Sequence, residues 1–299
     1  MNGRKRLSIE ANETLYAYML NVPAFILIFA TVIFPIVYSL EVSLLDWNLK
    51  RPMAKTFIGL RNYIDILSEP DFLQTLGRTF VFVFLSVGVM VVLGLAISLL
   101  LSQEFKGRGA LRAIVLIPWA IPAVVNGIMW KWILDASYGI LNAGLLGLGL
   151  TESYIPFLAQ PSTAFGFAVV ANIWKRIPFA IILLLAALQT IPDELYEAAT
   201  VDGTSAWKKL TNITLPMISQ TLMVVLIFQT MISLRVFDLI YVLTSGGPGD
   251  ATEVVGWHLY KEAFQFLQVG RGSAIGYIIA IITFLLAILY YRLLYRRIY

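Results

Sequence analysis

The chain has 299 residues, of which 59% are apolar and only 13% are charged, and its mean hydropathy is +0.80. Soluble domains have fewer apolar and more charged residues, so this composition predicts an integral membrane protein. The absence of cysteine excludes disulfides and thiolate metal sites, and a single histidine does not build a metal centre alone. The formal charge of +4 does not indicate nucleic-acid binding, because the basic residues lie mostly at the ends of apolar runs.

Six apolar runs are long enough to cross a bilayer, because a spanning helix needs about 20 residues that satisfy their own backbone hydrogen bonds. The first run is too long for the core of a signal peptide, so we interpret it as a retained span. The predicted fold class is an all-α membrane protein with a tail at 1–16 and one transmembrane domain at 17–299. The spans are expected at 17–40, 79–102, 113–133, 163–190, 213–240 and 272–292.

An even number of spans places both termini on one side of the membrane. Eleven basic residues then share that side and seven lie in or beside the opposite loops, so the positive-inside rule makes both termini cytoplasmic. A further apolar segment, 136–151, is predicted to be an extracytoplasmic loop, because another span would put the arginine-rich C-terminus outside. The eleven residues are Arg4, Lys5, Arg6, Lys106, Arg108, Arg112, Lys208, Lys209, Arg292, Arg296 and Arg297.

Two extracytoplasmic loops are expected to carry local structure. The loop at 41–77 is long enough for a short amphipathic helix at 63–76, interrupted at Pro70, which we interpret as a lid. The loop at 245–250 combines three glycines with Pro248, so it permits positive φ angles and requires the fifth span to end before it.

A polar segment at 197–216, EAATVDGTSAWKKLTNITLP, separates the fourth and fifth spans. Pro192 is expected to end the fourth span, and Asp193 is placed to cap a new helix that runs to about Val201. This first helix presents Leu195, Ala198, Ala199 and Asp202 on one face, and small alanine side chains let another protein's backbone approach closely, with Glu197 at the edge of the contact.

The second half of this segment predicts a turn and another helix. Asp202-Gly203 ends the first helix, and Thr204 or Ser205 can cap a second one that continues toward the fifth span. The segment is therefore predicted to be a cytoplasmic helix-turn-helix. The residues leave two interpretations open: a docking surface for a protein, or an amphipathic loop whose Lys208 and Lys209 meet anionic lipid.

Glu197-Ala198-Ala199, followed three residues later by Gly203 and then by Ile213 and Leu215-Pro216, resembles the signature loop of ABC importer permeases that work with binding proteins. The resemblance covers about 79–290 and implies the type I permease fold. It also implies that the first helix is a coupling helix, which docks in a cleft of a cytoplasmic ATPase. The coupling residues are then expected to be Glu197, Ala198, Ala199, Asp202 and Gly203.

Residues 237–248, FDLIYVLTSGGP, resemble the carbohydrate-uptake branch of this family, specifically first permeases of the maltose and glycerol-phosphate type. Tyr260, Ala263 and Phe264 continue the pattern. Without the resemblance, 246–249 would be an ordinary turn. The resemblance implies a non-catalytic subunit of an ATP-driven importer of a sugar or oligosaccharide, located in a bacterial or archaeal cytoplasmic (inner) membrane.

The partners implied by the resemblance are a second homologous permease, two ATPase subunits that bind ATP and Mg, an extracytoplasmic sugar-binding protein and membrane lipid. No cofactor is expected in this chain itself. Two other functions stay open: import of a phosphorylated or acidic polyol or sugar, and ATP-independent secondary transport. Secondary transport needs intramembrane charge relays or discontinuous helices, for which the sequence offers few candidates.

Polar side chains recur at helical spacing inside the third, fourth and fifth spans. Polar groups in hydrocarbon are costly and usually face the protein interior or a water-filled path, although one amide more often bonds a neighbouring helix than a ligand. The resemblance implies that these positions lie where the maltose-type permease holds its sugar. The expected substrate path consists of Trp119, Ala123, Asn126, Asn172, Lys175, Arg176, Gln229 and Ser233.

Trp119 offers an aromatic face on which a pyranose ring can stack. Lys175 and Arg176 suit an anionic substrate, but basic residues in the outer part of a span also snorkel to headgroups or form ion pairs, and we favour this second interpretation. Arg235 and Asp238, three residues apart, are expected to pair with each other or to gate the exit.

Proline and histidine complete the set of candidate residues. Pro118 and Pro122 lie inside the third span and are expected to kink it, since each removes a backbone donor. His258 has no neighbouring carboxylate pattern that suggests catalysis. The sequence contains no nucleophile arrangement, metal-ligand cluster or phosphate-binding loop, so it predicts no enzyme active site.

Overall fold

The computed structural model describes residues 3–294. Arg296 and Arg297, predicted to be cytoplasmic, lie outside the described residues, as do the side chains of Arg4, Lys5 and Arg6. The chain forms two compact units, and the boundaries between them fall after residues 65, 261 and 277. The first unit contains 1–65 and 262–277, and the second contains 66–261 and 278–299.

The first unit opens with an apolar helix that a π-helical turn interrupts. Residues Tyr16–Ser43 have a mean hydropathy of 2.4 over 28 residues, which is long enough for a span and confirms the predicted first one. The π turn directly precedes the turn of helix that holds Pro35, which lacks an N–H group and cannot take part in the regular hydrogen-bond ladder. The elements are α1 (Gly3–Ile28), η1 (Phe29–Ile33) and α2 (Phe34–Ser43).

A small antiparallel hairpin follows α2, and the sequence did not predict it. β1 (Leu45–Trp47) pairs with β2 (Lys55–Phe57), and the Lys55 Nζ atom lies 3.8 Å from the centroid of the Trp47 ring. The Asn62 amide fixes the hairpin to the end of α2 by donating to the carbonyls of Ser43 and Leu45, at 2.8 and 3.0 Å. The remaining elements of this region are α3 (Arg61–Ser68), η4 (Lys261–Gln265) and the start of α15 (Val269–Leu294).

The predicted short helix with an interruption at Pro70 is confirmed, but it covers only 61–68 and does not extend to 76. α3 ends at Ser68, and Pro70 starts the long helix α4 (Pro70–Ser102), of which residues 70–76 form the first two turns. Proline is favoured at the first position of a helix because the N–H that it lacks has no partner there in any case. The predicted second span at 79–102 is therefore confirmed but begins nine residues earlier.

In the second unit, α4 and α8 (Pro161–Leu188) make the most extensive helix-helix contact. Small residues permit this close approach: a Cβ atom added to Gly94 would lie 3.2 Å from the Ala180 Cβ. The Ser98 hydroxyl, whose oxygen lies 2.6 Å from the Gly94 carbonyl and 3.1 Å from the Ile181 carbonyl, links the two helices. Small and hydroxylated residues are the usual means by which helices associate in lipid.

The predicted third span is not one helix. α5 (Arg108–Ala120) and α6 (Ala123–Ile133) meet at an angle of 98°. The break lies at Ile121-Pro122, where Ile121 has the extended backbone that a following proline favours. The predicted kink at Pro122 is thus confirmed in an extreme form, whereas Pro118 lies inside α5 without ending it.

The predicted fifth span is also broken. Helical residues Ala206–Met217 meet α12 (Ser219–Leu234) at 72°, and α12 ends six residues before the predicted boundary at 240. Four helices in the described residues are long and apolar enough to span a membrane, or up to six if each bent pair is one span. The segments around the bend are α9 (Asp193–Val201), α10 (Ala206–Lys209), η3 (Leu210–Thr214) and α11 (Leu215–Met217).

The apolar segment at 136–151 contains only the eight-residue helix α7 (Ile140–Gly147), which is too short to span, as predicted.

The turn at 245–250 holds positive φ angles, as predicted, including +87° at Gly246, where the Trp257 indole leaves no room for a Cβ atom. The remaining elements of the unit are η2 (Phe157–Ala159), α13 (Asp238–Leu243) and α14 (Val255–Tyr260).

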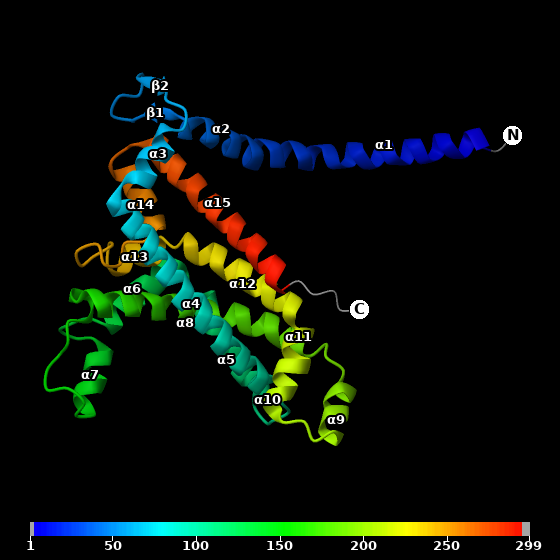
Figure 1. The fold of residues 1–299 in the computed structure, drawn as a ribbon, viewed down its shortest axis with the longest axis vertical. Helices are drawn as coiled ribbons and strands as arrows, with labels where there is room; N and C mark the ends of the chain where they lie inside the picture. Colours follow the sequence, from blue (N-terminus) through cyan, green and yellow to red (C-terminus); the bar gives the residue numbers. More distant parts are fainter. Residues whose placement is uncertain (1–2, 295–299) are drawn as a thin grey trace. The chain divides into compact units, whose positions relative to one another are not determined.

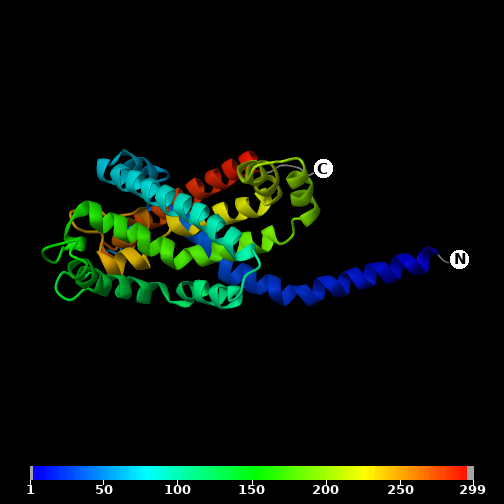
Figure 2. The same ribbon diagram turned by 90° about the horizontal axis from the view of Figure 1, so that it is seen from below.

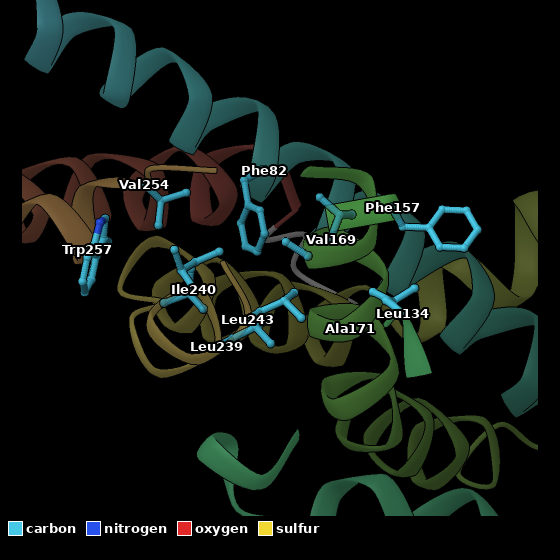
Figure 3. Close-up of a cluster of buried hydrophobic side chains, with 12 residues drawn as sticks. Phe82, Leu134, Phe157, Val169, Ala171, Leu239, Ile240, Leu243, Val254 and Trp257 are labelled. Carbon is cyan, nitrogen blue, oxygen red and sulfur yellow. The ribbon is translucent and has the colours of Figure 1, made fainter. Parts of the chain in front are cut away.

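A cluster of buried apolar side chains holds α4, α8, α13 and α14 together. Figure 3 shows Phe82 of α4 beside Val169 of α8, with Ile240 and Leu243 of α13 next to them. The Val255 amide donates to the Thr79 hydroxyl at 2.9 Å and ties the start of α14 to α4. Of these elements, α13 and α14 lie at the end of the second unit that is opposite α9 and α10 (Figures 1 and 2).

A buried carboxylate fastens the segment between α13 and α14. Glu253 is 3% exposed, and its two oxygens lie 2.6 Å from His258 Nδ1 and 2.6 Å from Lys261 Nζ. Burial works to raise the pKa of Glu253, but the hydrogen bonds from His258 and Lys261 and their charges outweigh burial and lower the pKa to about 2. The carboxylate is therefore a structural anion that fixes α14.

We expect Gly94→Leu to weaken the α4–α8 contact by about 2 kcal/mol, because the larger side chain has to displace Ala180. The measurement is thermal unfolding of the detergent-solubilised protein. Gly88→Leu is the matched control, since Gly88 lies on the same helix with open space around its Cβ position. Equal losses of stability in the two variants would contradict the packing argument.

We expect Glu253→Gln to lower the free energy of unfolding by about 3 kcal/mol at neutral pH, because it leaves Lys261 without its buried anion. Since folding lowers the pKa of Glu253, its contribution is complete above its ordinary pKa of 4.5 and is lost as the pH falls toward 2. Melting temperatures of the wild type and the variant, recorded from pH 7 downward, should therefore converge on acidification. The exposed Glu152→Gln serves as the control.

Candidate functional site

The polar segment between α8 and α12 folds as the predicted helix-turn-helix. α9 begins at Asp193, but Pro192 is the N-cap residue and no side chain caps the helix, so the predicted capping by Asp193 is wrong. Asp193 and Glu194 instead lie in the first turn, where negative charge stabilises the positive end of the helix dipole. The helix ends at Val201, as predicted.

Gly203 ends α9 in the left-handed conformation, with φ at +68°. The Gly203 amide donates to the Thr200 carbonyl at 3.0 Å and the Thr204 amide donates to the Ala199 carbonyl at 2.9 Å, which is a Schellman motif. Ser205 then caps α10 by accepting from the Lys208 amide at 3.4 Å. The break at Gly203 and the cap at Ser205 are both confirmed.

Side-chain hydrogen bonds make this coupling loop, residues 193–217, one body. The Lys209 Nζ atom donates to the Thr200 hydroxyl at 2.6 Å and so joins the two helices. The hydroxyls of Tyr196 and Thr214 lie 2.9 Å apart and join α9 to the π-helical turn before α12. These bonds connect α9 to the segment that leads into α12.

The exposed face of the coupling loop differs from the predicted one. Ala198 is exposed, as are Glu197 and Asp202, but Ala199 is buried. The structure adds two apolar side chains that the sequence analysis did not select: Val201 is 89% exposed and Trp207 is 71% exposed. The sequence alone could have indicated these two residues, because apolar residues in a polar segment are candidates for a docking surface.

A second candidate site is a cavity of about 280 Å³ in the second unit. It lies where three segments meet: the start of α6 after the break, the middle of α8, and the junction between α12 and α13. Five of the eight predicted substrate-path residues line it. Its lining consists of Ala123, Asn126, Asn172, Lys175, Arg176, Ile232, Arg235, Val236, Phe237, Asp238 and Leu239.

The other three predicted path residues lie elsewhere. Trp119 is on α5, is 55% exposed and does not line the cavity. Gln229 and Ser233 are buried behind the wall, where the Gln229 amide donates to the Arg176 carbonyl at 3.0 Å and Ser233 accepts from Asn172 at 3.4 Å. These two residues position α8 against α12.

Lys175 and Arg176 turn toward the protein, so the preferred interpretation as snorkelling or ion-paired side chains is wrong. The Lys175 Nζ atom donates to the carbonyl of Ile121, at the break between α5 and α6. The Arg176 Nε atom donates to the Asn172 side-chain oxygen at 2.8 Å. In the described residues, no ion pair within 4.0 Å involves either side chain.

Asn126 presents an acceptor that lacks a donor. The residue is 1% exposed, and its Nδ2 atom lies 3.4 Å from the Ala171 carbonyl, while its Oδ1 atom has no hydrogen-bond partner. A buried polar atom without a partner is costly, so Asn126 Oδ1 is an acceptor that a water or a bound solute at the cavity wall can satisfy.

The junction after α12 supplies residues that the sequence analysis placed inside an unbroken span. Arg235 and Asp238 both line the cavity, but they do not form the predicted pair, because the Arg235 Nε atom donates to the Met231 carbonyl at 3.2 Å instead. Phe237 is the aromatic residue of the lining, and its ring centroid lies 4.5 Å from that of Tyr260 and 5.5 Å from that of Tyr241. Phe237, and not Trp119, is therefore the aromatic residue that borders the cavity.

Comparison with known proteins gives a consistent result. Residues 90–298 match the family described as the inner membrane component of binding-protein-dependent transport systems. The trehalose/maltose transport system permease protein MalF of Thermococcus litoralis is 39% identical over 288 residues, which cover 96% of this chain and 95% of that protein. The trehalose transport system permease protein SugA of Mycobacterium tuberculosis is 38% identical over 282 residues, covering 91% and 88% of the two chains.

A solved structure shares the fold. In the crystal structure of a bacterial ABC transporter involved in the import of the acidic polysaccharide alginate, one chain superposes with a TM-score of 0.81 at 25% identity, covering 96% of this chain and 98% of that chain. The similarity extends beyond the predicted 79–290 and confirms the resemblance to type I ABC importer permeases. The chain belongs to the family of inner-membrane components of binding-protein-dependent transport systems.

Proposed function

We propose that this chain is one transmembrane subunit of an ATP-driven importer that carries a sugar or oligosaccharide, received from a binding protein, across the cytoplasmic (inner) membrane. Relatives named for trehalose and maltose transport support the substrate class. The observation that carries the proposal is the cavity at the broken third span, with Asn126 and Phe237 in its wall. A sugar hydroxyl supplies the donor that Asn126 Oδ1 lacks, and a pyranose face stacks on the Phe237 ring.

The coupling loop is proposed to dock on a cytoplasmic ATPase, with a second permease subunit and a second ATPase completing the membrane complex. Its exposed Ala198, Val201 and Trp207 support a protein contact, because large exposed apolar side chains at a loop are typical of interfaces. In this assignment ATP and Mg bind to the ATPase subunits, and this chain has no cofactor and no catalytic role of its own.

The proposed topology has a tail at 1–16 and a transmembrane permease domain at 17–299, with both termini in the cytoplasm. The excess of basic residues on that side supports it. In this orientation the coupling loop is cytoplasmic, and the opposite end of the second unit, with α6, α7, α13 and α14, faces the binding protein (Figures 1 and 2).

We expect Glu197→Lys to abolish copurification of the ATPase with this chain, because it reverses the charge at the edge of the docking face. The measurement is the ATPase-to-permease ratio after affinity purification in detergent. Glu152→Lys makes the same charge change on an exposed residue outside the coupling loop and should leave the ratio unchanged. Full ATPase recovery with Glu197→Lys would count against the docking proposal.

We expect Phe237→Leu to reduce ATP-driven uptake by roughly fivefold, because it removes the aromatic face of the cavity. Trp119→Leu should leave uptake nearly unchanged, since Trp119 does not line the cavity. The assay uses proteoliposomes with the complete transporter, its binding protein and a panel of radiolabelled neutral and acidic sugars. Uptake of every sugar without ATP, or by this chain alone, would refute the importer assignment.

A further inference from the structure

Arg176 is held in a fixed position at the wall of the cavity. Its Nε atom donates to Asn172 Oδ1 at 2.8 Å, and the other amide atom of Asn172 lies 3.4 Å from the Ser233 hydroxyl. The backbone carbonyl of Arg176 accepts from Gln229 at 3.0 Å. Gln229 and Ser233, both buried on α12, therefore hold the Arg176 backbone and its partner Asn172 in place. The terminal N–H groups of the guanidinium remain for a ligand.

The charge of Arg176 is not balanced by a direct contact. In the described residues no carboxylate forms an ion pair with it within 4.0 Å, although Asp238 lies on the same cavity wall. Basic residues inside a membrane domain normally pair with an anion, because an unpaired charge there is costly. The arrangement keeps a planar donor whose neighbouring carboxylate, Asp238, makes no direct contact with it.

The other charges of the lining favour the same kind of ligand. Lys175 and Arg235 are the remaining basic residues, so three basic side chains face one acidic side chain, Asp238. Lys175 is bonded to the Ile121 carbonyl and Arg235 to the Met231 carbonyl, whereas Arg176 is held by a side chain of the cavity wall, Asn172, and keeps its two terminal nitrogens for a ligand. The eleven-residue helix α6 begins at the cavity with Ala123, so the positive end of its dipole also lies there.

We infer that the sugar substrate carries an anionic group, a carboxylate or a phosphate, which binds to Arg176 in this cavity. The planar guanidinium donates two parallel hydrogen bonds to such a group. Asn126 Oδ1 accepts from a hydroxyl of the same sugar, and Asp238 is placed to accept from another. This inference rests on the proposed function, because it specifies the chemical class of the substrate in the proposed transport site.

The test measures binding to the permease site without the binding protein, so that receptor selectivity cannot determine the outcome. Saturation-transfer difference NMR on the purified permease–ATPase complex gives dissociation constants for two matched pairs. The pairs are trigalacturonate with its methyl ester, and glucose 6-phosphate with glucose. In at least one pair the acid should bind at least about tenfold more tightly than the neutral partner.

Arg176→Gln should remove this preference by weakening the acid about tenfold or more, while the neutral partner changes less than about twofold. Arg176→Lys keeps the charge and should retain part of the preference, which guards against a misfolded glutamine variant. Lys131→Gln, an exposed basic residue of α6 outside the cavity lining, is the matched control and should keep the full preference.

The inference is overturned if neither acid binds more tightly than its neutral partner, including the case in which no acid binds, or if Arg176→Gln keeps the preference. ATP-driven uptake of a neutral sugar that is insensitive to Arg176→Gln would also overturn it and would leave the proposed import function intact. Failure of ATP-driven uptake for every sugar would instead refute the import function itself.

Discussion

The structure depends on the requirement that backbone carbonyls in a membrane domain find a hydrogen-bond donor. A helix that breaks in hydrocarbon exposes such groups, and Lys175 of α8 satisfies the one at Ile121. The next residue, Arg176, lies about 100° further around the same helix and reaches Asn172 and the cavity. One short stretch of α8 therefore both supports the break in the neighbouring span and lines the space that the break creates.

Much of the fold was predictable because apolar length is a strong signal in a membrane protein. The first, second, fourth and sixth spans follow directly from it. The interruptions of the helices do not follow from apolar length, because apolar residues lie on both sides of each interruption. After Leu234, the last residue of α12, for example, Val236 and Phe237 continue the apolar run. Pro122 predicted the break between α5 and α6, but it did not determine the angle of 98° between these helices.

The site was partly predictable for the same reason. Helical spacing within one span correctly grouped Asn172 with Arg176, since residues four apart share a face. Spacing does not show which spans face each other, so Trp119 was selected and Phe237 was not. The turn in the coupling loop was predicted correctly because Gly203 and Ser205 act locally, whereas the burial of Ala199 does not follow from local sequence.

Discontinuous helices were expected of a secondary transporter, yet they occur here in a member of a binding-protein-dependent family. A broken helix provides free carbonyls, free amides and space near the middle of a membrane domain. Those properties suit the recognition of a polar solute and say nothing about the source of energy. In this chain it is the family match, and not the continuity of the helices, that distinguishes the two classes.

The hydrogen bonds within the coupling loop have a mechanical meaning. The loop is continuous with α12 through the bend at Ile218, and α12 is a rigid rod of 16 residues, about 24 Å long. One end of this rod receives any movement of α9, and the other end carries Ile232 and leads directly into Arg235 and Phe237 in the cavity wall. A rotation of α12 would therefore change the shape of the cavity, although the coupling loop lies at the other end of the helix.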